Sequence, residues 1–180
     1  VLSPMEIRKS IYHGDFYELL ERLNGLESWR LLLGQSKKQK RLRDVEFVLR
    51  TLAMRYSLSE YEKPMKGFLN NFMAVQQAES NATKGDSLNK LGVFFTKAVD
   101  EVVDKLGEKP FHLRGRLNVA AMDSILPLAH RFSGATKDTI SKRYQALKND
   151  AGFINDTSYN TSDASVVKKR FKTAKEFLLG

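Results

Sequence analysis

The stretch that decides the fold class reads Asp44-Val45-Glu46-Phe47-Val48-Leu49-Arg50-Thr51-Leu52-Ala53-Met54-Arg55-Tyr56. From Val45 to Tyr56, apolar side chains recur at i, i+3, i+4, i+7, i+8 and i+11. This spacing places them on one face of an amphipathic α-helix. Glu46 and Arg50 are four residues apart, in the order that stabilises a helix surface. The stretch therefore predicts a helix that packs against a core through one face.

Helical spacing continues on both sides of this stretch. Ser3-Pro4-Met5-Glu6 offers an N-cap residue, a proline at the first helical position and an acidic first turn. Further apolar faces are predicted at Phe16, Leu19, Leu20 and Leu23; at Trp29, Leu32 and Leu33; at Met65, Phe68, Leu69, Phe72 and Met73; at Leu88, Leu91, Phe95, Ala98, Val99, Val102 and Leu106; at Leu117, Ala121, Ile125 and Leu128; at Ile140, Tyr144 and Leu147; and at Val167, Phe171, Ala174 and Leu178. Polar composition predicts loops at 80–86 and 155–162.

No convincing strand alternation interrupts these faces, and a parallel sheet would need several β-rich runs that are absent. We therefore predict an all-α fold: a single helical domain over residues 1–180, with about seven to eight helices. The polar stretch near residue 84 suggests a division into two sub-bundles, 1–80 and 86–180.

Composition limits the class of protein. A length of 180 residues suits one domain, and 42% hydrophobic with 28% charged residues argues against disorder along the whole chain. The absence of cysteine excludes disulfides and cysteine-ligated metals, which fits the cytoplasmic location that we predict. No apolar run approaches the roughly 18–20 residues of a membrane span, so no membrane partner is expected. The first residues lack both a signal-peptide pattern and an initiator methionine, and we expect a fragment of a longer chain.

The motifs of common active sites are missing. The sequence has no P-loop, no dinucleotide-binding glycine pattern, no histidine pair at zinc spacing and no nucleophile elbow. His13, His112 and His130 are scattered, and we interpret them as surface or packing residues. We assign no catalytic residue, no metal ligand and no cofactor to this chain, and whether the parent protein is an enzyme stays open.

Basic residues offer candidate contacts with nucleic acid. The formal charge of +9 attracts phosphate backbones, although it also serves solubility. Five cations fall within seven residues, in a loop that runs into the helix at Val45: Lys37, Lys38, Lys40, Arg41 and Arg43. These five are our candidate DNA-binding residues, and a solvated loop is the alternative. A second group on the last helix is better explained as a solvent-exposed face: Lys168, Lys169, Arg170, Lys172 and Lys175.

A third group combines carboxylates with arginines: Asp44, Glu46 and Arg50, beside Glu6 and Arg8. Such a set can position a nucleotide or a metal ion. Salt bridges between helices explain it equally well, because ion pairs of this kind are common in folded proteins. The spacing alone does not separate the two interpretations.

Several segments, in their order, resemble one family. Leu2-Ser3-Pro4-Met5-Glu6-Ile7-Arg8, Ile11-Tyr12 and Gly14-Asp15-Phe16 resemble its pattern L-x-x-x-E-I-R-x-x-I-Y-x-G-x-F. Trp29 and the run from Lys40 to Arg50 resemble its K-R-M-x-D-x-E-x-x-L-R helix, and Tyr61, Met65 and Phe68-Leu69-Asn70 continue the match. Asp150, Phe153, Thr161 and Arg170 fall in a similar order. The family is the N-terminal domain of GmrSD-type, modification-dependent restriction endonucleases, and this chain resembles its helical portion only.

The resemblance implies a component of a bacterial defence system against phage. Members couple recognition of DNA modification to nucleotide hydrolysis in an upstream ParB-like domain, and an HNH-type nuclease domain or subunit often cuts. The family's Asp-Gly-Gln-Gln-Arg motif is absent here, so a nucleoside triphosphate and a divalent metal would be cofactors of the full-length protein only. The resemblance implies that Glu6 and Arg8, with Asp44, Glu46 and Arg50, lie around that site and position it without contacting the substrate. The alternative is a stand-alone helical module that binds a protein partner; an apolar patch away from Glu6 and Arg8 would favour it.

Overall fold

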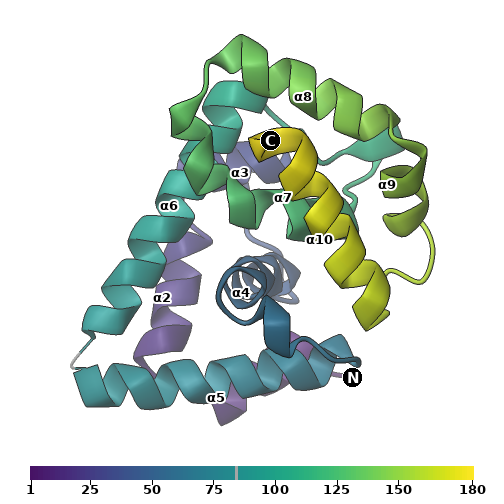
Figure 1. Cartoon of the computed structure of the whole chain (residues 1–180). Coiled ribbons are helices and arrows are strands. Elements are labelled where there is room, and N and C mark those ends of the chain that lie inside the picture. The colour runs from purple at the N-terminus through teal and green to yellow at the C-terminus, as the bar shows by residue number, and fades with distance from the viewer. Residues whose placement is uncertain (84) are drawn as a thin grey trace.

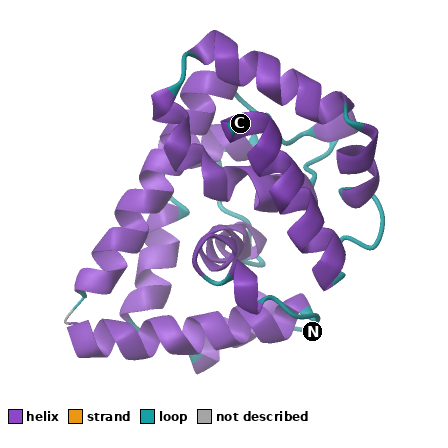
Figure 2. Ribbon diagram, viewed as in Figure 1, coloured by secondary structure: helices purple, strands orange, loops and turns teal. Residues whose placement is uncertain are grey.

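The computed structural model of the chain describes residues 1–83 and 85–180. Across these two ranges it holds ten α-helices, three 3-10 helices and no strand, so the predicted all-α fold class is confirmed (Figures 1 and 2). The α-helices are α1 (Pro4–Ile11), α2 (Asp15–Leu23), α3 (Glu27–Leu33), α4 (Arg43–Tyr56), α5 (Met65–Thr83), α6 (Asp86–Leu106), α7 (Val119–Ile125), α8 (Lys137–Asn149), α9 (Ala151–Asp156) and α10 (Ala164–Leu179). The 3-10 helices are η1 (Leu58–Glu60), η2 (Leu113–Gly115) and η3 (Leu126–Gly134).

Local sequence signals set several helix ends. At the start of α1, the Ser3 hydroxyl accepts from the Glu6 N–H at 3.2 Å, and the Glu6 carboxylate accepts from the Ser3 N–H at 2.6 Å. This reciprocal capping box satisfies two backbone donors that the first turn of a helix leaves unpaired. The C-terminal end of α3 is also set locally: the helix stops at Gly34, whose φ of +64° is a left-handed conformation that favours glycine.

Helix α4 lies at the centre of the molecule. In Figure 1 it is seen end-on between α2, α5 and α10, and it packs against α1, α2, α5, α6 and α7. The predicted apolar face is buried, and so are Phe47 and Met54 on other sides. Tyr56, predicted at the end of that face, is 45% exposed. The prediction of one buried face was too narrow, because a helix surrounded by others buries more than one stripe.

One hydrophobic core spans the sub-bundle boundary suggested by the sequence. Helix α6 packs against α2 and α3 on one side and against η3 and α8 on the other. The buried apolar side chains of both halves form a single cluster, which includes Leu52 and Phe95. Within the described ranges, no helix is both long and apolar enough to cross a membrane.

Two predicted loops are partly helical. In the stretch 80–86, α5 continues to Thr83 and α6 begins at Asp86, while Lys84 lies outside the described residues. In the stretch 155–162, α9 includes Asn155 and Asp156. Polar residues have a weak preference against helix, and tertiary packing overrides it: Ser80 and Asp156 are both buried.

Candidate functional site

The carboxylates and arginines of the predicted supporting set do not converge on one site. Arg8 on α1 pairs with Glu46 on α4, with 2.7 Å between Nη1 and Oε2. The Arg8 Nε also donates to the Asn70 amide oxygen on α5 at 2.8 Å. Glu6 is used in the capping box with Ser3. Arg8 and its partners therefore join three helices, which is the salt-bridge arrangement that the sequence left open.

Asp44 belongs to a different pair, formed with a residue that sequence reasoning missed. Its carboxylate lies 2.8 Å from Nη1 of Arg30 on α3, and the Asp44 side chain is fully buried. Arg30 is the cation in the otherwise apolar run Trp29-Arg30-Leu31-Leu32-Leu33, and that position was the signal available in the sequence. Burial opposes ionisation of Asp44, but hydrogen bonds from the Gln39 N–H and from Arg30 outweigh it. The pKa of Asp44 therefore lies below its ordinary value.

The Arg30–Asp44 pair also holds the backbone of the basic loop. Arg30 Nε donates to the Gln35 carbonyl at 2.9 Å, and Nη2 reaches the Lys37 carbonyl at 3.5 Å. The Asp44 carboxylate accepts from the Gln39 N–H at 3.0 Å. Three points of the loop backbone are thus fixed by one buried ion pair, which we call the Arg30–Asp44 clamp.

The five predicted DNA-binding cations are all exposed, and they differ in their partners. Lys38 lies 3.4 Å from the Glu21 carboxylate, and Arg41 lies 3.8 Å from Glu6. Lys37, Lys40 and Arg43 form no salt bridge with any described residue. These three are consequently the cations best placed to meet a phosphate.

A second buried cluster links α4, α7 and α10. Arg50 donates from Nε to Oδ1 of Asp123 at 3.1 Å and forms a second, shorter contact with Oδ2. Arg170 lies 3.9 Å from the same Oδ2, donates to the Ser124 hydroxyl at 3.0 Å and to the Thr161 carbonyl at 2.6 Å. Burial lowers the pKa of Arg170, and Asp123 opposes that shift only in part.

The burial of Arg170 corrects one prediction. Most cations of the last helix were expected to lie opposite its apolar stripe, on a solvent-exposed face, and Arg170 is an exception at 1% exposed. Its position three residues after Val167 and four before Ala174 places it on the apolar side of α10. The remaining four cations of that group are exposed, as expected: Lys168, Lys169, Lys172 and Lys175.

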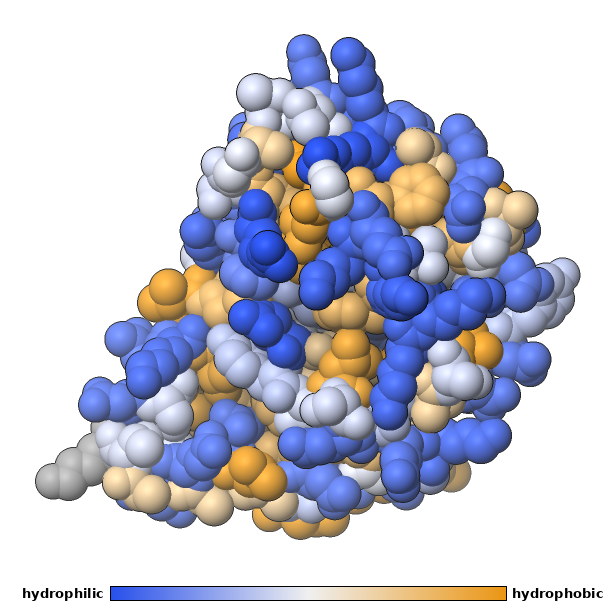
Figure 3. All heavy atoms as spheres, viewed as in Figure 1, coloured by the Kyte–Doolittle hydropathy of each residue, from blue (hydrophilic) through white to orange (hydrophobic). Residues whose placement is uncertain are grey.

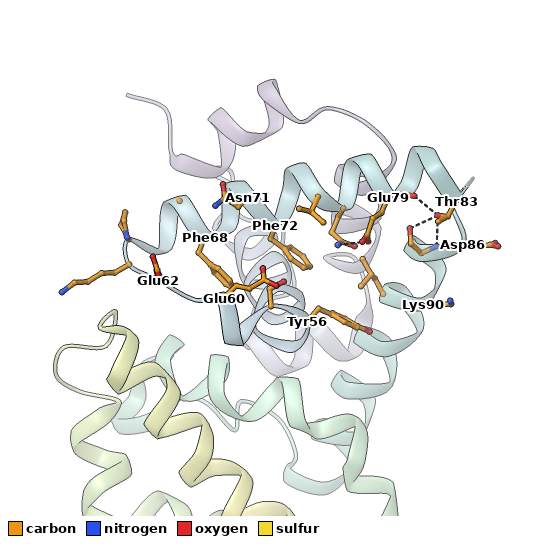
Figure 4. Close-up of a pocket in the computed structure, with 18 residues that line it drawn as sticks. Tyr56, Glu60, Glu62, Phe68, Asn71, Phe72, Glu79, Thr83, Asp86 and Lys90 are labelled. Atoms are coloured by element: carbon orange, nitrogen blue, oxygen red, sulfur yellow. Dashed lines mark hydrogen bonds between the residues drawn. The ribbon is translucent and has the colours of Figure 1, made fainter.

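A large groove lies along α5, away from these ion pairs. It has a volume of about 1040 Å³ and is lined by α5, the end of α4, η1 and the start of α6. Figure 4 shows Phe68 and Phe72 pointing into it from α5, with Tyr56 on its opposite side. In the space-filling view the surface is mostly hydrophilic, and apolar atoms gather in separate patches, several of them along the lower edge where α5 runs (Figures 1 and 3).

The histidines lie apart from one another. His13 is exposed, while the His130 ring packs edge-on against Phe94 at 5.2 Å between centroids. Among the described residues, no three His, Cys, Asp or Glu side chains are grouped so that they could hold a metal ion.

Comparison with protein-family models, with curated proteins and with solved structures found no match to this chain.

Proposed function

We propose that this chain is the helical part of a GmrSD-type restriction protein, and that it offers the basic loop 37–43 to DNA. In the full-length protein it would also support an upstream ParB-like domain, which would hydrolyse a nucleoside triphosphate with a divalent metal, and act beside an HNH-type nuclease domain or subunit. The observation that carries the DNA contact is the Arg30–Asp44 clamp, which fixes the loop backbone while its cations point outward.

Order in the loop matters for affinity. Binding costs free energy when it immobilises a flexible segment, on the order of 0.5–1.5 kcal/mol for each long side chain. Ordering the loop backbone costs further free energy, and a loop whose backbone is already held at Gln35, Lys37 and Gln39 avoids this backbone cost. Lys37, Lys40 and Arg43 form no ion pair with a described residue, so phosphate would not have to displace a carboxylate from them.

The surroundings of Glu6 and Arg8 support the docking of an upstream domain. Ile7 and Ile11 lie one turn apart on α1 and are 38% and 65% exposed. They lie on either side of Arg8 in the sequence, and the resemblance assigns Arg8 to the neighbourhood of the ParB-like site. An apolar surface beside Glu6 and Arg8 is what the restriction-protein interpretation requires. The groove along α5 lies away from these two residues and supports the alternative, a helical module that binds a protein partner.

The DNA contact is tested by titrating labelled duplex DNA with the protein across a salt series. The variant Lys37→Gln/Lys40→Gln/Arg43→Gln removes the three cations without an ion pair. Each phosphate contact contributes a slope of about −0.9 to the dependence of log K on log salt. We expect binding to weaken about tenfold or more in the variant, and the magnitude of the slope to fall by about two to three.

The matched control removes the same number of charges elsewhere. Lys168→Gln/Lys172→Gln/Lys175→Gln neutralises three exposed cations on α10. This control should keep the slope of the native protein. Equal losses in both variants would mean that net charge alone attracts DNA, and no binding by a folded protein at low salt would reject the proposal.

A further inference from the structure

The groove along α5 does not serve the proposed DNA contact. Its residues lie at the intervals of three and four that define one face of a helix: Gly67, Phe68, Asn71, Phe72, Val75, Gln76, Glu79 and Thr83. On this face Asn71, Val75, Glu79 and Thr83 are exposed, whereas Phe68, Phe72 and Gln76 are buried at its base. We infer that the groove binds a basic amphipathic helix of a partner protein.

The shape of the groove fits a helix. From Gly67 to Thr83, α5 rises about 24 Å, the length of a helix of about 16 residues. Tyr56 at the end of α4 lies across the groove from α5 (Figure 4), and Leu91 and Lys90 on α6 also line it, so the groove is bounded by more than one helix. Helix-in-groove recognition of this kind uses apolar anchors at i, i+3, i+4 and i+7.

The centre of the groove is apolar. Val75 is 51% exposed and Tyr56 is 45% exposed, although both are large apolar or aromatic side chains. Phe68 and Phe72 also line the groove but are only 7% and 4% exposed, and their rings pack edge-on against Tyr61 and Phe16. Anchored aromatic rings give a rigid floor, and covering the two exposed side chains would remove apolar area from water.

The rim of the groove has the opposite charge to the molecule as a whole. Glu62 lies near one end, Glu79 and Asp86 lie near the other, and Glu60 lies between these ends on the η1 side (Figure 4). Two lysines also line the groove, and Lys63 is already paired with Asp163 outside it at 2.9 Å. A chain with a formal charge of +9 therefore presents a locally acidic groove. Such a rim repels phosphate and acidic peptides and favours a helix that carries cations near both ends.

The test uses a synthetic peptide as the probe. It is a helix of about 16 residues with leucines at i, i+3, i+4 and i+7 spacing and lysines in the first and last turns. The matched probe replaces each lysine with glutamate and keeps the leucines. Amide chemical shifts of the isotope-labelled full chain report the site, and we expect the lysine probe to shift resonances of α5, η1 and the start of α6.

Two variants examine the rim and the floor separately. Glu60→Gln/Glu62→Gln/Glu79→Gln/Asp86→Asn removes the acidic rim, and Glu18→Gln/Glu27→Gln/Glu108→Gln/Asp100→Asn removes four exposed carboxylates elsewhere. We expect the rim variant to weaken binding about tenfold and the matched variant to change it little, because both raise the net charge by the same amount but only the first removes carboxylates at the groove. Val75→Lys should abolish binding, whereas Val93→Lys, at a valine that is 63% exposed and lies outside the groove, should not.

These outcomes separate the inference from the proposed DNA contact, because the probe contains no phosphate. The inference is overturned if the lysine probe causes no shifts, if its shifts lie outside the groove, or if the glutamate probe binds equally well. Shifts at the loop 37–43 with the glutamate probe would instead indicate a basic surface that attracts acidic peptides. Loss of DNA binding in the loop variant, with peptide binding intact, would show that the two surfaces act independently.

Discussion

Buried charge is the feature of single residues that most affects this fold. Arg8, Asp44, Asp123 and Arg170 are each at most 2% exposed, and each lies near an opposite charge or a hydrogen-bond partner. Removing one partner of a buried pair costs about 3–5 kcal/mol, because the other charge is left without compensation. These residues are consequently more sensitive to substitution than the exposed cations of the loop.

The Arg30–Asp44 clamp gives a prediction with a pH dependence. Asp44→Asn should lower the free energy of unfolding at neutral pH by about 3 kcal/mol, because it leaves Arg30 unpaired in the interior. The pKa of Asp44 is lower in the folded protein than in the unfolded chain, where it is about 3.9. Its contribution is therefore present above that value and is lost as the pH falls through the folded pKa.

Urea unfolding of both proteins between neutral pH and about pH 3 measures this contribution. The difference between the native protein and Asp44→Asn should narrow below about pH 4. Asp100→Asn, an exposed carboxylate on α6, is the control and should change stability by less than about 0.5 kcal/mol. A difference that stays constant down to pH 3 would mean that the Asp44 charge does not stabilise the fold.

Among the helices, α10 depends on a polar contact as well as on its apolar face. Arg170 fixes α10 against α7 through Ser124 and Asp123, and Arg50 brings α4 to the same carboxylate. Arg170, which is buried, and Arg50, whose side chain is 15% exposed, thus share one anion, and Nη2 of Arg170 has no hydrogen-bond partner in the described structure. The surplus positive charge makes Asp123 the residue on which the junction of the three helices depends.

We predict that Asp123→Asn destabilises the protein by about 3–5 kcal/mol, since it leaves Arg50 and Arg170 without a counter-charge. Arg170→Met should cost less, because it removes the cation with an unpaired nitrogen and keeps much of the side-chain volume. Adding Arg170→Met to Asp123→Asn should recover part of the loss, which denaturation midpoints will show. An additive result for the double variant would contradict the idea that both arginines depend on Asp123.

Elements were predictable where their signals are local. The helix start at Ser3, with proline at the first position and an acidic first turn, depends only on neighbouring residues, and the structure has it where the sequence predicts it. Arg170 was misjudged because the carboxylate beside it, Asp123, comes from a distant segment. Sequence patterns contain no information about which helix will supply a buried counter-charge.

The candidate site was predictable to a similar extent. The cations of 37–43 are visible as a charge run, but the pairing of Arg50 with Asp123 joins residues 73 positions apart. The groove was also hidden, because Phe68 and Phe72 were assigned only to the apolar side of a helix. Its existence depends on how α5, η1 and α6 are placed relative to one another.

At the scale of the whole molecule, the sequence suggested two sub-bundles, whereas the buried side chains form one cluster. We predict a single cooperative thermal transition, because α6 packs against helices from both halves. Scanning calorimetry checks this by comparing the calorimetric with the van't Hoff enthalpy, which agree for a two-state transition. Two transitions, or a calorimetric enthalpy well above the van't Hoff enthalpy, would show that the halves unfold separately.

Charge is distributed unevenly over the same molecule. Cations lie on the loop 37–43 and along the outer side of α10, while carboxylates line the groove beside α5. A molecule with separate basic and acidic surfaces can bind two partners of opposite charge at the same time. Simultaneous occupation is therefore expected if both proposed contacts occur.

The central position of α4 has a consequence for folding specificity. Its Asp44, Glu46 and Arg50 meet partners from three different helices, α3, α1 and α7. Apolar contacts depend only weakly on which apolar side chains meet, whereas a one-turn rotation or shift of this helix would separate all three ion pairs at once. Replacing the pairs with apolar residues of similar size can preserve or even raise stability. What such a chain would lose is the single permitted orientation of its innermost helix, so that robustness and uniqueness of the native state are separate properties here.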